Sequence, residues 1–183
     1  MQQETKPLSQ KGSWPVVPGV LLLAFLLVAS IWATRFFSAE ARVGRASARV
    51  VRWVEKPGEE SPVSLGLAAN RLGKVLSTNA VLELDGYGAL ATGRQEIVQL
   101  FAQIRASLGI VAFEHLEIAA VAAGRGAVTA RVVARYRLVP EGGEAAEGNG
   151  TAELLWIKGK DGWQISRAVL RAEEGASLPN GWK

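Results

Sequence analysis

Three hydrophobic patterns follow one another along the chain, and the first is an uninterrupted apolar run. Residues 16–33 read VVPGVLLLAFLLVASIWA, and no charged residue lies between Ser13 and Thr34. A helix of 18 residues at about 1.5 Å rise per residue is about 27 Å long, close to the hydrocarbon thickness of a bilayer. We therefore predict a transmembrane helix over residues 14–37, preceded by a polar tail over residues 1–13.

Aromatic residues flank this run in the way that interfacial anchors do. They are Trp14 on one side and Trp32, Phe36 and Phe37 on the other. A cleaved signal peptide is the alternative, because Ala39-Glu40-Ala41 offers a small-x-small cleavage site. That site lies beyond Arg35, and the run is longer than most signal-peptide hydrophobic regions. The sequence therefore favours a retained, single-pass anchor.

A stripe of five basic residues follows the apolar run at intervals of 3, 4, 3 and 4 residues. Its members are Arg42, Arg45, Arg49, Arg52 and Lys56. This spacing predicts one side of a basic juxtamembrane helix, with its linker, over residues 38–60. The stripe is either a solvated helix face or a contact with anionic lipid headgroups or an acidic partner subunit.

After residue 60 the apolar spacing changes from a helical period to strict alternation. Helical spacing predicts helices over residues 62–76 and from Thr92, with a Thr92–Gln95 capping box, to Leu108. Alternation predicts strands over residues 80–84, 89–91, 111–123, 127–139, 151–158 and 163–171. We therefore predict an α+β cone over residues 61–172, in which a curved antiparallel sheet packs on helices, and a C-terminal tail over residues 173–183.

Composition narrows the possible chemistry. The chain has no cysteine and one histidine, His115, which excludes disulfides, thiolate sites and His-pair metal sites. Residues 1–57 carry eight basic and three acidic side chains, whereas residues 58–183 carry thirteen and fourteen. The predicted cone is thus near neutral, so we expect no nucleic-acid partner. The sequence has no Walker loop, dinucleotide fingerprint or metal-ligand cluster, so we expect no metal and no cofactor.

The charge division also bears on localisation. We expect the protein in a cell inner membrane, with one span. The Lys/Arg count favours the C-terminal flank as cytoplasmic, whereas a signal-anchor topology would place the cone outside. The sequence leaves the side of the globular domain undecided.

Three turn and packing motifs resemble a known superfamily. They are Gly93-Arg94 with Ile97, the strand start from Gly124 to Val128, and the hairpin Lys160 to Trp163 with Ile165. With their flanking strands they look like the nuclear transport factor 2-like (NTF2-like) superfamily, in its SnoaL-like, polyketide-cyclase branch. The resemblance covers roughly residues 61–172 and implies a cone with a pocket between sheet and helices.

Activity does not follow from this resemblance, because relatives of this fold include isomerases, cyclases and non-catalytic binding modules. Ketosteroid isomerase-like members carry a tyrosine on the first helix and two acids facing the pocket. The helix predicted over residues 62–76 has neither a tyrosine nor an acid. The sequence therefore favours a protein that is not an enzyme.

Three residues are weak catalytic candidates. His115, with Glu117 two residues along the same strand, could form an acid–base pair, or it could be a structural histidine. Asp85 and Tyr87 flank Gly86, where they could act as a base and an oxyanion donor. Asp-Gly followed by Tyr-Gly is also simply good turn chemistry, and we favour that interpretation.

A possible docking face lies on two of the predicted strands. Its members are Arg131, Arg135, Arg137, Trp163, Ile165, Arg167 and Arg171. The three arginines of the strand over residues 127–139 oppose an apolar row that contains Tyr136. Arginine and tryptophan are favoured at interfaces, although arginines also pair with glutamates on ordinary sheet surfaces.

Two functional hypotheses remain. The leading one is a non-catalytic, membrane-anchored accessory or scaffold subunit of a larger membrane complex, with other subunits or a homodimer partner, and membrane lipids, as its contacts. Its architecture is similar to that of the inner-membrane scaffold subunits of type IV secretion systems. The alternative is a membrane-tethered SnoaL-like cyclase or isomerase, or a small hydrophobic-ligand binder that uses the cone pocket.

Overall fold

The computed structural model describes residue 26 and residues 38–173. The chain divides into two compact units, Met1–Ser38 and Ala39–Lys183. The transmembrane helix that we predict over residues 14–37 lies outside the described residues, apart from residue 26, and so do its four aromatic anchors. Within residue 26 and residues 38–173, no helix combines the length and hydropathy that crossing a bilayer requires.

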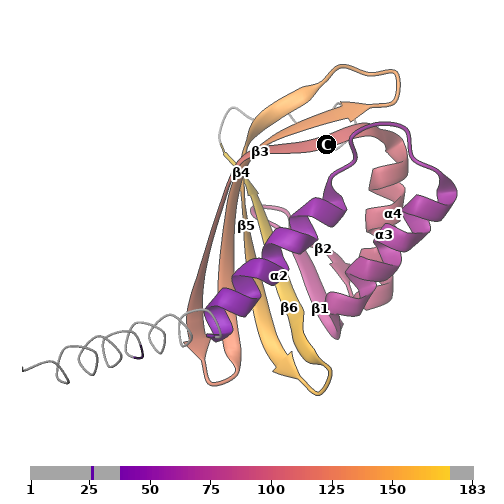
Figure 1. The fold of residues 1–183 in the computed structure, drawn as a ribbon. Coiled ribbons are helices and arrows are strands. Elements are labelled where there is room, and N and C mark those ends of the chain that lie inside the picture. Colours follow the sequence, from indigo (N-terminus) through magenta and orange to yellow (C-terminus); the bar gives the residue numbers. More distant parts are fainter. Residues whose placement is uncertain (1–25, 27–37, 174–183) are drawn as a thin grey trace, which may run out of the picture. The chain divides into compact units, whose positions relative to one another are not determined.

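The second unit is an α+β domain in which three helices cover one face of a curved, six-stranded sheet (Figure 1). The sheet order is β2-β1-β6-β5-β4-β3, and every neighbouring pair is antiparallel except β1 and β6. The elements are α2 (Ala39–Val54), α3 (Pro62–Val75), β1 (Leu76–Leu84), β2 (Gly88–Thr92), α4 (Arg94–Ser107), β3 (Leu108–Gly124), β4 (Ala127–Pro140), β5 (Ala146–Gly159) and β6 (Gly162–Ala172). The predicted α+β cone is confirmed.

Local sequence sets the starts of α3 and α4. Ser61 is the N-cap of α3, where its hydroxyl accepts a hydrogen bond from the Ser64 amide at 3.2 Å. At α4 the N-cap is Gly93, and the Glu96 carboxylate reaches back to the Thr92 amide at 2.9 Å. The Thr92–Gln95 capping box that we predicted is therefore wrong by one position, although the reciprocal-cap chemistry is present in part.

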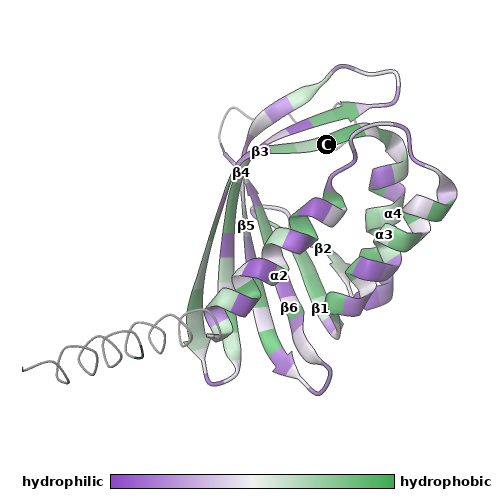
Figure 2. Cartoon of the chain, viewed as in Figure 1, coloured by the Kyte–Doolittle hydropathy of each residue, from purple (hydrophilic) through white to green (hydrophobic). Residues whose placement is uncertain are grey.

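Helix α2 packs against the inner face of the sheet. Val43, Ser47 and Val50, at intervals of four and three residues, are buried against it. In Figure 2 the visible side of α2 is largely hydrophilic, and the strands behind it are largely apolar. The helix that we predicted as a juxtamembrane segment, apart from a cone beginning at residue 61, is the first helix of the compact unit that begins at Ala39.

A buried tryptophan joins α2 to the middle of the sheet. Trp156 on β5 is fully buried, and its indole N–H donates to the Ser47 hydroxyl, also fully buried, at 3.1 Å. Val43, Val128 and Ile165 belong to the same apolar cluster. The space between α2 and the centre of the sheet is therefore filled by side chains.

Two irregularities in strand pairing change which side chains face outward. Between Glu114 and Glu117 the β3–β4 register shifts, and His115 has a φ of 51°. Between Leu155 and Trp156 the β5–β6 register shifts, so that Trp156 lies opposite Ile165 while Leu155 lies opposite Arg167. Each bulge reverses the alternation that the sequence pattern predicts beyond it.

Candidate functional site

The inner face of β4 carries a buried polar atom with no partner. Burial alternates along the strand through Val128, Ala130, Val132 and Ala134, which are all buried, and Tyr136 continues this row. The Tyr136 hydroxyl oxygen is buried and makes no hydrogen bond. Burial also raises the pKa of this phenol. A buried donor without a partner is uncommon in a folded protein and points to something that pairs with it.

Small residues surround the Tyr136 ring. Gly148 lies opposite Tyr136 on β5, and Gly150 follows on the same face. A Cβ atom at Gly150 would come within 3.4 Å of the ring, so glycine leaves the room that the ring occupies. Phe113 on β3 is the neighbour on the other side. The neighbouring side chains on β3 and β5 are therefore apolar and offer the Tyr136 hydroxyl no hydrogen-bond acceptor.

The part of the interior that the structure describes has few buried polar side chains. Among the described residues, the buried polar or charged side chains are Ser47, Lys56, Arg105 and Thr151. None of these is a carboxylate or an imidazole.

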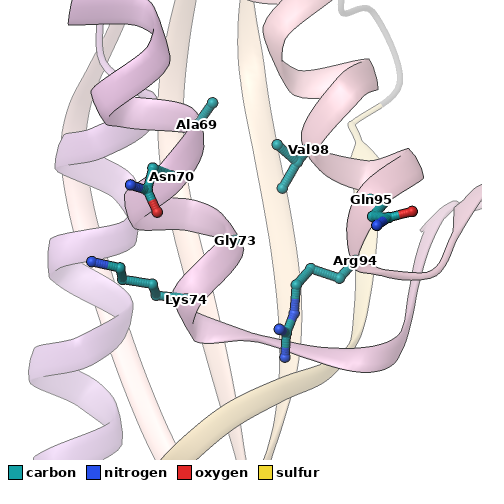
Figure 3. A pocket seen from close by; sticks show the side chains of 7 residues that line it. All are labelled: Ala69, Asn70, Gly73, Lys74, Arg94, Gln95 and Val98. Carbon is teal, nitrogen blue, oxygen red and sulfur yellow. The ribbon is translucent and has the colours of Figure 1, made fainter.

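A separate groove of about 300 Å³ lies between α3 and α4 (Figure 3). Val98 faces Gly73 across it, and a Cβ atom at Gly73 would meet the Val98 side chain at 3.3 Å. Its lining residues are Ala69, Asn70, Gly73, Lys74, Arg94, Gln95 and Val98. This groove lies between two helices and does not include Tyr136.

The three predicted catalytic candidates are dispersed over the surface. Asp85 is exposed in the turn after β1 and pairs with Arg171 at 3.0 Å. Tyr87 is 71% exposed. His115 is exposed in the β3 bulge, where the register shift between Glu114 and Glu117 interrupts the alternation on which the predicted pair of His115 and Glu117 depended. Asp85 and Tyr87 thus lie in one exposed turn, whereas His115 lies on a different strand.

Lys56, which we predicted as a lipid or partner contact, is buried with 4% exposure, so that prediction is wrong for this residue. Its ammonium donates to the Arg105 carbonyl at 3.1 Å and to the Leu108 carbonyl at 2.5 Å, at the end of α4. Arg105 donates in return to the Trp53, Val54 and Glu55 carbonyls at the end of α2, at 2.8–2.9 Å. Lys56 therefore caps the end of α4, and Arg105 caps the end of α2.

Glu60 completes this network. Arg105 donates to both Glu60 carboxylate oxygens, at 2.6 and 3.1 Å, in a bidentate pair. The hydrogen bonds from Arg105 lower the pKa of Glu60, against the opposing effect of burial. The linker after α2 is thereby held to the end of α4.

This pair predicts an acid-dependent loss of stability. Because the pKa of Glu60 is lower in the folded state than in the unfolded chain, the pair stabilises the fold above the unfolded value of about 4.3. That contribution is lost as the pH falls through the folded-state pKa. We expect a Glu60→Gln variant to show a shallower decline of unfolding free energy between neutral and acid pH than the unmodified protein. Urea titrations across this range, with Glu59→Gln as the exposed control, measure it; equal slopes would contradict the assignment.

The predicted docking face is divided by the β6 bulge. Ile165 is buried and Trp163 packs against the core, so neither belongs to an outer face with the arginines, and the prediction is wrong for these two. The remaining arginines are exposed on the outer face, where four of them pair with acids. These pairs are Arg135 and Arg137 with Glu147, Arg167 with Glu83, and Arg171 with Glu153 and Asp85.

Several solved structures are similar to this chain in fold. A ketosteroid isomerase-like protein from Erwinia carotovora atroseptica superposes with a TM-score of 0.56 at 17% identity, over 75% of this chain and 98% of that one. An NTF2-like protein with a cystatin-like fold from Novosphingobium aromaticivorans gives 0.51 at 13% identity, over 92% and 95%. A candidate scytalone dehydratase from the same organism gives 0.54 at 16% identity, over 76% and 93%.

These similarities show that the domain has the NTF2-like fold that the sequence motifs predicted. Identities below 20% carry the fold and leave activity open. No protein-family model matches the chain, and no curated protein sequence matches it.

Sequence reasoning did not single out Tyr136. Its place in the apolar row of the strand over residues 127–139 is the signal that could have found it, since a tyrosine among inward-facing aliphatic residues needs a partner for its hydroxyl. The Trp156–Ser47 contact has no comparable signal, because 109 residues separate the two.

Proposed function

We propose that this protein is a non-catalytic, membrane-tethered binding module whose cone holds a small, largely apolar molecule beside the Tyr136 hydroxyl. The unpartnered Tyr136 hydroxyl is the observation that carries the proposal. An unpaired polar group in a protein interior costs about 1–3 kcal/mol. A ligand with one hydrogen-bonding group would remove this cost on binding.

The chemistry of the site defines the ligand class. A phenol both donates and accepts, so it pairs with a carbonyl or a hydroxyl group. Phe113, Ala134 and the β5 glycines around it favour an apolar skeleton. The absence of buried carboxylates and imidazoles among the described residues supports binding rather than turnover. An isomerase-like and a dehydratase-like protein share the fold, which supports a small-molecule occupant of the cone.

Replacing Tyr136 with phenylalanine tests the proposal through two opposite effects. Without ligand we expect the Tyr136→Phe variant to gain about 1 kcal/mol of stability, because the unpaired hydroxyl is removed. With 2-naphthol as the probe, we expect the unmodified chain to be stabilised against thermal unfolding and the variant to lose most of that gain. The matched control is Tyr87→Phe, since Tyr87 is the only other tyrosine and is exposed.

Two outcomes would contradict the proposal. A Tyr136→Phe variant that is less stable than the unmodified protein would show that the hydroxyl already has a partner, such as an ordered water. Equal naphthol binding by both proteins would show that the hydroxyl takes no part in recognition.

A second candidate function is a scaffold subunit that docks through the sheet edge. β3 is an edge strand, and it has no charged residue from Ile118 to Gly124. Val121 on this strand is 66% exposed. Such an edge offers backbone groups to a partner strand. Native mass spectrometry of detergent-extracted full-length protein tests it: we expect a complex that Val121→Lys weakens, and a lone monomer would reject it.

A further inference from the structure

The start of α2 and two hairpin turns lie together at one end of the domain. In Figure 1 the β3–β4 turn and the β5–β6 turn lie at the end where α2 begins. A backbone hydrogen bond connects the two hairpins, in which the Lys158 amide donates to the Gly126 carbonyl at 2.8 Å. Helix α2 approaches β3 near its start, since a Cβ atom at Gly44 would lie 4.0 Å from the Ala120 side chain. We call this the α2-start end.

Charge is unequally divided between the two ends of the domain. At the α2-start end, the first two turns of α2 and the two hairpin turns carry five cations and two acids. The cations are Arg42, Arg45, Arg125, Lys158 and Lys160, and the acids are Glu40 and Asp161. At the other end, the loops over residues 55–61 and 141–145 carry Glu55, Glu59, Glu60, Glu141 and Glu144. The one cation in those loops, Lys56, is buried, and one of the acids, Glu60, is paired with Arg105.

The predicted transmembrane helix and α2 are neighbours along the chain. Five residues separate the last residue of the apolar run, Ala33, from Ala39, the first residue of α2. Even fully extended, the six residue steps from Ala33 to Ala39 span only about 22 Å. In sequence, the start of α2 is therefore the part of the domain nearest to the predicted transmembrane helix.

We propose that the α2-start end docks on an anionic lipid surface, with Arg125, Lys158 and Lys160 of the two hairpin turns joining Arg42 as headgroup contacts. The acidic loops of the other end are then turned away from the negative surface. This inference rests on the predicted transmembrane helix and is independent of the ligand proposed for the cone.

The proposal divides the predicted arginine stripe. Arg52 lies ten residues after Arg42 on α2, which is about 15 Å along the helix axis. Because α2 runs along the sheet away from the α2-start end, the later arginines of the stripe lie farther from the headgroups. Each cation at an anionic surface is expected to favour docking about five-fold. The hairpin cations therefore add to the docking affinity beyond the contribution of the arginine stripe.

The absence of native cysteines allows a clean measurement. A fluorophore is attached through Ala123→Cys beside the β3–β4 turn or, as the matched control, through Ala145→Cys in the loop at the other end; both alanines are exposed. Full-length protein is reconstituted in nanodiscs of phosphatidylcholine, with or without phosphatidylglycerol, that contain headgroup-quencher lipid. We expect strong quenching at position 123 only, increased by phosphatidylglycerol and reversed by high salt.

Charge reversal identifies the contacts. We expect Arg125→Glu and Lys160→Glu each to shift the docking equilibrium by more than about five-fold towards the undocked state, because the reversal removes one attracted charge and adds a repelled one. Arg71→Glu, on the exposed side of α3, makes the same charge change and is expected to leave quenching unaltered. Equal quenching at positions 123 and 145, quenching indifferent to phosphatidylglycerol, or failure of the protein to enter nanodiscs would each overturn the proposal. Naphthol binding by the same preparations would be unaffected by these outcomes.

Discussion

Replacing Arg105 with leucine is expected to lower the free energy of unfolding by about 3–5 kcal/mol, the usual cost of removing one partner of a buried ion pair. Arg105 is 7% exposed, and the Glu60 side chain that it contacts is 14% exposed. The substitution leaves the Glu60 carboxylate without its bidentate partner. It also leaves the carbonyls of Trp53, Val54 and Glu55 without their donor at the end of α2. Urea unfolding of the full chain, monitored by circular dichroism, measures the change.

Two further variants separate the causes of this loss. Arg105→Lys keeps the charge but cannot form the fork, so we expect an intermediate loss. Arg105→Leu combined with Glu60→Leu removes the unpaired carboxylate, and we expect it to recover part of the stability. A loss below about 1 kcal/mol for Arg105→Leu alone would place the pair among ordinary surface ion pairs and would refute the capping role.

Much of the fold could be predicted because its elements are specified locally. The Ser61-Pro62 start of α3 and the Asp161-Gly162 turn between β5 and β6 each depend on residues within one turn. Alternation likewise identified the buried row of β4 that runs from Val128 to Ala134. Such signals need no knowledge of distant residues.

Long-range features could not be predicted in the same way. A bulge depends on the partner strand, so nothing in the local pattern around His115 or Ser166 predicts that the outward face changes there. The basic stripe from Arg42 to Lys56 is continuous in sequence, yet its last member turns inward because the α4 carbonyls lie at that point. Burial of a cation is decided by acceptors that are remote in sequence.

The candidate site follows the same division. Local chemistry made Asp85, Tyr87 and His115 conspicuous, and all three are exposed. Tyr136 was visible only as a member of an apolar row, because the lack of an acceptor near its hydroxyl is a property of the neighbouring strands. A sequence pattern shows which side chain faces inward, whereas its unmet hydrogen bond appears only with the surrounding atoms.

Replacing Trp156 with alanine is expected to cost about 3–5 kcal/mol of unfolding free energy, since a fully buried aromatic side chain is removed and the neighbours collapse only in part. The substitution also leaves the buried Ser47 hydroxyl without its indole donor. This contact connects α2 to β5, so the substitution should weaken the packing of α2 on the sheet as well as the core. We expect faster amide hydrogen exchange in α2 than in α3, measured by mass spectrometry.

Ser47→Ala is the matched control, because it removes the hydrogen bond and keeps the tryptophan. We expect it to cost about 1–3 kcal/mol, the penalty for leaving the buried indole N–H unpaired. The double variant Trp156→Phe with Ser47→Ala removes both polar groups, so it should be less destabilised than the sum of Trp156→Phe alone and Ser47→Ala alone. Strict additivity of the two losses would show that the 3.1 Å contact contributes nothing to the attachment of α2 to the sheet.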